Sequence, residues 1–245
     1  MNKKNWAAFQ AVLKRYRDYT GDLAKNTPGL AGQIQRLVDE RQGPSYRVET
    51  PVVYNGALAD IGPSDEIKLI LAADNPGRRE QAAENRRYLV GPSGKIAENF
   101  FRKNPGLGID FRKNVLILNK TPIHTPRTAE LRELCRLGGE KTAAAVLSSQ
   151  RVMAELLLAF HRALGGPVWI IGYSEMKKGG VFEAYTETLK ALYAPEPLRE
   201  KLFFYRHFSM NQFTIDLSKQ AGEGGDLAGS LERIGAAYRM RTLGW

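Results

Sequence analysis

The chain has 245 residues, enough for one sizeable α/β domain or for a domain with a small appendage. Its 36 lysine and arginine residues outnumber its 26 acidic residues and give a formal net charge of +10. That excess favours a polyanionic partner, although charge alone supports a basic surface without a ligand about equally well. The single cysteine, Cys135, excludes an internal disulfide and cannot hold an iron–sulfur cluster by itself.

The sequence shows no pattern typical of export or membrane insertion. No apolar stretch follows the lysines at the N-terminus, so we expect no signal peptide. No apolar run approaches the ~20 residues that a membrane-spanning helix needs. We therefore expect an intracellular, cytoplasmic protein that is not associated with a membrane.

The first elements along the chain are predicted to be helical. Apolar residues such as Trp6 and Phe9 recur at a spacing of three to four over residues 5–40, and Pro28 is placed as an early residue of a second helix. We interpret residues 1–45 as a helical extension of a single domain that spans residues 1–245. A short extended stretch follows at residues 52–54.

Four short apolar runs then alternate with helical patterns. This alternation predicts a three-layer α/β/α fold with a central, mainly parallel four-stranded sheet. The expected strands are 67–73, 115–118, 168–171 and 202–205. The expected helices are 92–103, 128–165 with a possible break at Gly138-Gly139, 178–192 and 226–240.

Ligands of open parallel sheets bind beyond the carboxyl ends of the strands, so the residues after each run carry the functional prediction. A carboxylate, two carboxamides, a histidine and a serine are expected to converge there. The segments are Asp74-Asn75-Pro76-Gly77, Asn119-Lys120-Thr121-Pro122, Gly172-Tyr173-Ser174 and His207-Phe208-Ser209.

Each of these segments also has an ordinary structural interpretation. The run 74–77 is common turn material, and Asn119 could cap the end of its strand. Residues 88–95 lead into a helix whose amides could approach a phosphate, but they lack Walker A spacing. A neutral imidazole at His207 could donate to a developing oxyanion or be structural. His161 is interpreted as structural, and His124 is assigned no role.

In their order and approximate spacing, these segments resemble the uracil-DNA glycosylase superfamily over roughly residues 50–215. Residues 73–77 are similar to the Gly-x-Asn-Pro-Gly motif of the mismatch-specific and single-strand-selective branches. Residues 88–95 resemble the Pro-Phe-Val-Gly-x-Ser-Gly segment of the iron–sulfur branch, whose cluster cysteines this chain lacks. Residues 115–119 resemble the strand that ends in the base-reading asparagine, and 207–209 the His-Pro-Ser motif.

The resemblance implies a monofunctional DNA glycosylase that removes uracil or a related deaminated base from flipped-out DNA during base-excision repair. Asn75 would position the water that attacks the sugar, with Asp74 as a second candidate for that role. Asn119 would hydrogen-bond the base, and His207 would donate to its O2. The chemistry requires no cofactor, and the histidines and the cysteine show no metal spacing, so we expect no metal.

The resemblance also implies how DNA and the base are held. Tyr88 or Leu89 would stack on the base, above a pocket floor at Gly77, and Met210 or Phe213 could wedge into the helix. Lys120 is expected to contact phosphate rather than act as a lyase nucleophile. The expected phosphate contacts also include Gly91, Ser93, Gly94, Lys95 and Ser209.

Departures from the family pattern keep two alternatives open. Ala73 replaces a glycine and Leu89 an aromatic, so the chain could be a relative that binds DNA or a nucleotide without excision. A nucleotide-binding protein that uses residues 91–95 is the third possibility. The basic residues expected at the DNA-facing edge are Arg78, Arg79, Arg86, Arg87, Lys177 and Lys178; Arg112 and Lys113 are expected at the opposite end.

Overall fold

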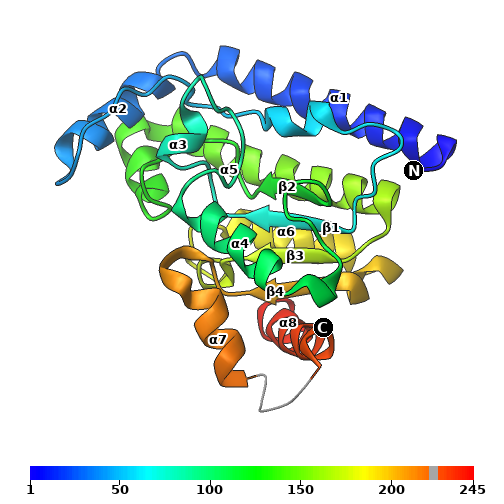
Figure 1. Ribbon diagram of the computed structural model, residues 1–245. Helices are drawn as coiled ribbons and strands as arrows, with labels where there is room; N and C mark the ends of the chain where they lie inside the picture. Colours follow the sequence, from blue (N-terminus) through cyan, green and yellow to red (C-terminus); the bar gives the residue numbers. More distant parts are fainter. Residues whose placement is uncertain (221–225) are drawn as a thin grey trace.

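The computed structural model describes residues 1–220 and 226–245 and contains the predicted parallel sheet (Figure 1). Its strands are β1 (Leu69–Ala73), β2 (Val115–Asn119), β3 (Val168–Ile171) and β4 (Leu202–Tyr205), in the order β2-β1-β3-β4. All three pairings are parallel, and nearly every strand residue is buried, as expected for a sheet covered on both faces. The predicted fold class is therefore confirmed.

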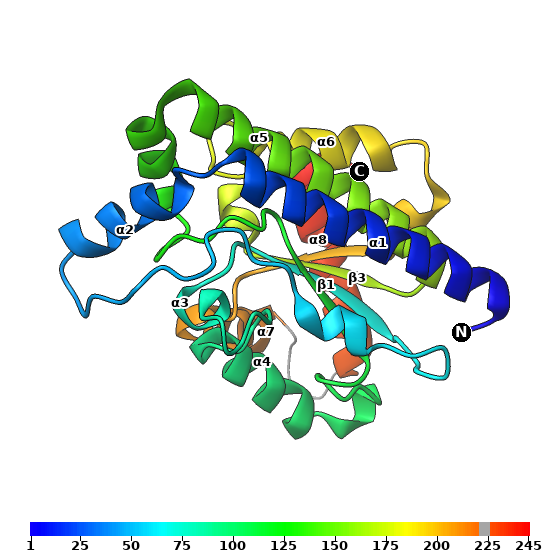
Figure 2. The same ribbon diagram turned by 90° about the horizontal axis from the view of Figure 1, so that it is seen from above.

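Helices cover both faces of this sheet (Figure 2). Helices α5 (Glu130–Leu164) and α6 (Glu183–Tyr193) lie on one face, and α4 (Pro92–Lys103) and α7 (Gln212–Gln220) lie on the other. Helix α8 (Leu227–Leu243) packs against β4. The connection from β1 to β2 thus crosses one face, and the connections from β2 to β3 and from β3 to β4 cross the other, as right-handed crossovers require when the strand order is β2-β1-β3-β4.

The helix boundaries agree with the sequence in most places and differ in a few. Helix α4 has the predicted bounds, whereas α6 begins later because Gly179 takes a left-handed backbone (φ 70°). The expected break in α5 occurs at Gly139 (φ 66°). The short α3 (Arg78–Gln81) and α7 were not predicted, and Val52 forms only an isolated antiparallel bridge to Ile123.

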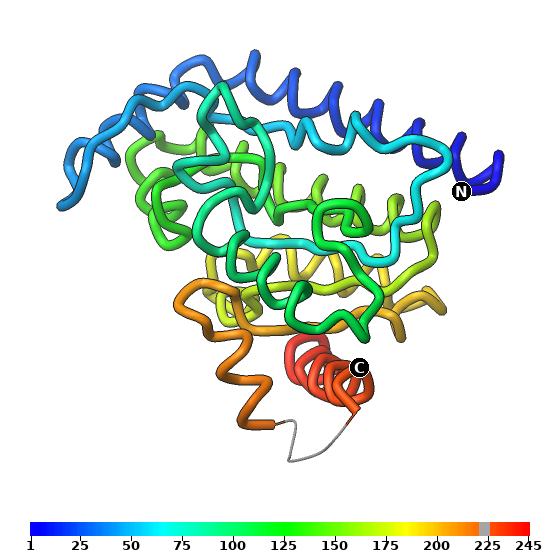
Figure 3. The backbone as a smooth tube through the Cα atoms, in the orientation of Figure 1, coloured from blue at the N-terminus to red at the C-terminus, as the bar shows by residue number. Residues whose placement is uncertain are grey.

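The N-terminal helices belong to the same core as the sheet. Helices α1 (Lys3–Asn26) and α2 (Leu30–Glu40) pack on α5 and bury Phe9 and Tyr16 completely. The chain after α2 returns alongside α1 (Figure 3), and the backbone N–H of Asn55 donates to the Tyr16 hydroxyl at 3.3 Å. Residues 1–45 are therefore an integral layer of the fold and not only an appended extension.

Helix α5 is long and apolar enough to cross a membrane by length and composition alone. Half of its most apolar window is buried within the molecule, where the helix packs against α6, α1 and α2. Its apolarity is thus accounted for by contacts inside the fold, as in the core helix of a layered domain.

Gly94, in the first turn of α4, is a position where the fold tolerates no side chain. A Cβ there would lie 1.5 Å from the carbonyl oxygen of Leu89. We expect Gly94→Ala to lower the free energy of unfolding by about 1–3 kcal/mol, because the backbone must shift to relieve the overlap. Gly21→Ala is the control, since that exposed glycine of α1 has nothing within 4 Å of its Cβ position. Urea unfolding curves that are equal for the two variants would contradict this close approach.

Candidate functional site

A cleft of about 700 Å³ opens at the carboxyl ends of the four strands. Segments that are far apart in the sequence form it: the turn after β1, the start of α4, the loop after β2 and the segment after β4. Most of the predicted site residues line it, namely Asp74, Asn75, Gly77, Leu89, Gly91, Ser93, Asn119, His207 and Ser209. The expected convergence of strand-end residues is therefore present.

The Asn75 side chain is fixed by two threonines of the loop after β2. Its Nδ2 donates to Thr125 Oγ1 at 2.9 Å, and its Oδ1 accepts from the Thr128 hydroxyl at 2.9 Å. Sequence reasoning missed both threonines. The only signal for them was the concentration of threonine in the loop after β2.

Asp74 forms a buried ion pair with Lys120. The lysine side chain is completely buried, and its Nζ lies 2.6 Å from Asp74 Oδ1 and also donates to the Ile171 carbonyl. The expected phosphate contact of Lys120 is therefore wrong, because its ammonium group is enclosed inside the fold. Gly172 makes room for the carboxylate, since a Cβ at that position would lie 2.4 Å from Asp74 Oδ1.

The second carboxylate oxygen of Asp74, Oδ2, makes a weaker hydrogen-bond contact than Oδ1 does. The Thr128 hydroxyl lies 3.4 Å from Oδ2 and has only one proton, which is better placed for Asn75. Asp74 retains 15 % side-chain exposure and lines the cleft. Asp74 thus lines the cleft with one carboxylate oxygen held by Lys120 and the other in a single long contact with Thr128.

His207 is held by the turn that follows β4. Its Nδ1 accepts the backbone N–H of Ser209 at 3.0 Å and lies 2.8 Å from the Ser209 hydroxyl. An Nδ1 that accepts a hydrogen bond leaves the proton of a neutral ring on Nε2. Burial lowers the pKa of His207 below its usual value, which favours that neutral form. The residue can therefore act as a donor through Nε2.

Asn119, the last residue of β2, contains an unsatisfied polar group. The residue is 2 % exposed and lines the cleft, and its Nδ2 is buried without a hydrogen-bond partner. A buried donor without a partner costs about 1–3 kcal/mol, so such groups in native proteins usually have a ligand or a functional reason. The Asn119 amide is therefore a candidate donor for a ligand of the cleft.

Glu80 ties two parts of the cleft wall together. Its carboxylate oxygens accept the backbone N–H groups of Gly77 at 2.8 Å and Leu89 at 2.7 Å. Burial raises the pKa of Glu80 to about 7. Arg112 also reaches this wall by donating to the Leu89 carbonyl, although it was expected at the opposite end of the sheet.

Leu89 and Tyr88 have opposite orientations. Leu89 has a left-handed backbone (φ 53°) and lines the cleft. Tyr88 is fully buried; its hydroxyl donates to the Val53 carbonyl at 2.6 Å and lies 2.8 Å from the Tyr16 hydroxyl. The expected stacking role of Tyr88 is therefore wrong. Within residues 1–220 and 226–245, no aromatic side chain lines this cleft.

Four other predicted contacts lie outside the cleft lining. Gly94 is buried beneath the Leu89 carbonyl, and Lys95 is exposed on α4 but does not line the cleft. Phe213 is 2 % exposed and packs in the core, so it cannot serve as a wedge. Met210 is 78 % exposed, with a left-handed backbone (φ 52°) in the turn before α7.

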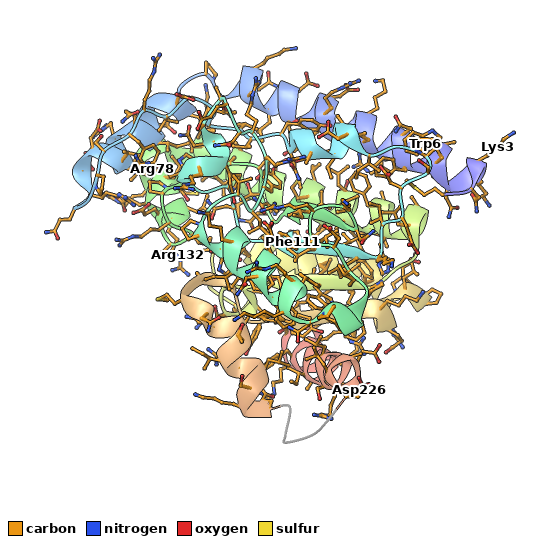
Figure 4. The ribbon with its side chains drawn as sticks, in the orientation of Figure 1. Lys3, Trp6, Arg78, Phe111, Arg132 and Asp226 are labelled. Carbon is orange, nitrogen blue, oxygen red and sulfur yellow. The ribbon has the colours of Figure 1, made fainter. Side chains whose placement is uncertain are left out.

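Basic side chains occur on the rim, but fewer than expected. Arg78, Arg79 and Arg127 line the cleft, and Figure 4 places Arg78 and Arg132 on the side where the strands end. Arg87 instead pairs with Asp60 at 3.1 Å, and Arg86 does not line the cleft. Lys177 and Lys178 are exposed after β3 but are not part of the lining.

His124, to which the sequence assigned no role, holds the turn after β1 from behind. Its Nδ1 lies 2.7 Å from the Pro76 carbonyl, and its Nε2 lies 2.9 Å from the Tyr46 hydroxyl. The second buried histidine, His161, contacts the Tyr193 hydroxyl inside the core, as its structural interpretation requires. His124 is thus a support of the cleft that its sequence context did not indicate.

The burial of His124 has a consequence for stability against pH. Its pKa is lowered from 6.5 to about 4, so below about pH 6.5 the unfolded chain binds a proton that the folded protein excludes until about pH 4. Stability should therefore fall as the pH falls through this window, by on the order of 3 kcal/mol in total. His124→Gln should remove this part of the slope in urea unfolding. Glu80 and His161 titrate alike in the parent and in His124→Gln, so their contributions cancel in the comparison. Equal slopes of stability against pH in the two proteins would contradict the prediction.

Within the described residues, 1–220 and 226–245, no group of three or more histidine, cysteine, aspartate or glutamate residues is arranged to hold a metal ion. The cleft brings together a fixed carboxylate (Asp74), a fixed carboxamide (Asn75), an unpaired carboxamide (Asn119) and a neutral imidazole donor (His207). No model of a known protein family matches the chain, and a search of curated proteins finds no match.

Proposed function

We propose that the protein is a DNA glycosylase that hydrolyses the N-glycosidic bond of uracil or a related deaminated base in DNA. The observation that carries the proposal is the unpartnered, buried Asn119 amide in a cleft that also contains Asp74, Asn75 and His207. A deaminated base presents the carbonyl oxygen that the Asn119 donor lacks. A base can reach that donor only after it leaves the DNA stack.

The side chains divide the reaction between them. Asn119 Nδ2 donates to a carbonyl of the flipped base, and His207 Nε2 donates to the oxygen on which charge develops. Asn75 holds the attacking water through the remaining lone pair of Oδ1, and Asp74 Oδ2 takes up the proton of that water. The water oxygen bonds to the sugar C1′, while the electron pair of the broken C–N bond leaves with the base.

The rim has features that suit a DNA backbone. Arg78, Arg79 and Arg127 add positive charge, and the first residues of α4, Gly91 to Ser93, line the cleft at a helix N-terminus, which favours phosphate. Met210 projects from the turn between β4 and α7, where an exposed apolar side chain could fill the gap left by a flipped base.

One observation favours a second candidate function, namely DNA binding without excision. None of the described residues that line the cleft is aromatic, so a flipped base would lack stacking worth about 1–3 kcal/mol. Base selection would then depend on hydrogen bonds from Asn119 and His207 and on the aliphatic face of Leu89.

The test is an alkaline cleavage assay on single- and double-stranded oligonucleotides that contain uracil, hypoxanthine or xanthine. The proposal expects strand breaks with at least one of these bases and none with the undamaged sequence. Binding of the same oligonucleotides should weaken steeply as salt rises. Salt-dependent binding without cleavage of any base would support the second candidate, and the absence of both would overturn both.

A further inference from the structure

We propose that Lys120 is a positioning residue that holds one oxygen of the Asp74 carboxylate in an ion pair and aims the other oxygen into the cleft. This inference rests on the proposed function and adds to it a residue that never reaches the substrate. It starts from the fact that a completely buried lysine lies directly behind Asp74, the carboxylate that immediately follows β1.

The burial of Lys120 has no advantage for packing alone. Moving an ammonium group out of water is costly, and an apolar residue of similar volume often serves the core as well or better. Its Nζ donates to Asp74 Oδ1 and to the Ile171 carbonyl and lies 4.8 Å from the centroid of the Phe182 ring. A charge held at this place and at this cost indicates a role in the site.

The geometry assigns separate roles to the two oxygens of Asp74. Lys120 holds Oδ1, and the carboxylate lies so close to Gly172 that a Cβ there would come within 2.4 Å of it. The plane of the carboxylate is therefore fixed, and Oδ2, with its single long contact to Thr128, is left for a water. Without the lysine, the carboxylate would lose both its orientation and its charge partner.

The charged and titratable groups around Asp74 come from several elements. Lys120 follows β2 and His207 follows β4, and the pKa of His207 responds to both Asp74 and Lys120. The remaining charged residues of the lining are Arg78, Arg79, Glu80, Arg127 and Glu175. These groups are the same in the parent and in a Lys120 variant, but the pKa of His207 responds to Lys120, so the profiles are also compared in a His207→Gln background, where a remaining shift reports on the ion pair.

The test compares the pH dependence of kcat/KM for the parent and Lys120→Met, with Lys190→Met on the exposed surface of α6 as the matched control. A carboxylate without its cation binds a proton about 1–3 pH units higher. We expect the acidic limb of the profile to move up by at least one pH unit, with much of the rate recovered at alkaline pH. The control should follow the parent profile.

A second pair of variants separates this role from misfolding. Lys120→Met should lower the Tm by leaving Asp74 without its cation, and Lys120→Met with Asp74→Asn should recover part of that loss because neither buried charge remains. A uniform loss of rate at every pH, with no shift of the acidic limb, would make Lys120 merely structural and overturn the inference. A parent that excises no base would overturn the proposed function, and with it this role, whatever the Tm values show.

Discussion

Asp74→Asn should abolish most of the proposed excision activity and also weaken the fold. Loss of the group that accepts the proton of the water should reduce the rate by about 10²- to 10⁴-fold. The same change leaves the Lys120 ammonium group buried without its counter-charge, and breaking a buried pair in this way costs about 3–5 kcal/mol. Single-turnover excision and urea unfolding measure the two effects separately.

Asp60→Asn is the matched control for this variant. It removes the carboxylate of an exposed ion pair with Arg87, outside the cleft, and exposed pairs contribute about 0–1 kcal/mol. The control should therefore unfold close to the parent and excise at the parent rate. If Asp74→Asn behaved like Asp60→Asn in both measurements, neither the buried pair nor the proposed role of Asp74 would stand.

His207→Ala is expected to lower the rate of excision by about 10²- to 10³-fold, the usual effect of removing one donor to a developing oxyanion. The imidazole is partly exposed and bonds only to the turn that contains Ser209, so the variant should unfold close to the parent. Excision rates at saturating enzyme give the effect on chemistry, and affinity for uncleaved DNA gives the effect on binding.

The contrast with Asn119 makes this prediction specific. If His207 serves the departing base, His207→Gln should regain part of the rate, because a carboxamide can still donate from this position. Asn119→Ala should instead reduce discrimination among bases, since it removes a donor buried in the cleft. Full activity in His207→Ala would show that His207 does not donate to the departing base and would leave Asn119 as the hydrogen-bond donor in that role.

The sheet could be predicted because its strands are short, buried on both faces and separated by amphipathic helices. Such strands appear in the sequence as continuous apolar runs, and the polar residue that ends each run marks the functional edge. This is why Asp74, Asn119 and His207 were predicted at one edge and lie in one cleft in the structure.

The wrong predictions concern residues whose positions depend on contacts with distant parts of the chain, which local sequence patterns do not show. Tyr88 was predicted to face the base, but its hydroxyl is bonded to Tyr16, which is 72 residues away in the sequence. Lys120 was predicted to contact phosphate, but it is buried, and its ion pair is with Asp74, 46 residues earlier. Successive side chains of a strand point to opposite sides. If Asn119 faces the base, the side chain of Lys120 is therefore expected to point away from it, and this was a signal for its burial.

The backbone of Leu89 is constrained from several sides, and this has a consequence for how the protein could change. Its N–H is held by Glu80, its carbonyl by Arg112, and the start of α4 leaves no room for its path to move. The side chain of Leu89, in contrast, makes none of these backbone contacts and can vary while the scaffold stays the same. Position 89 is where natural variation or a designed library could alter base preference without a redesign of the fold.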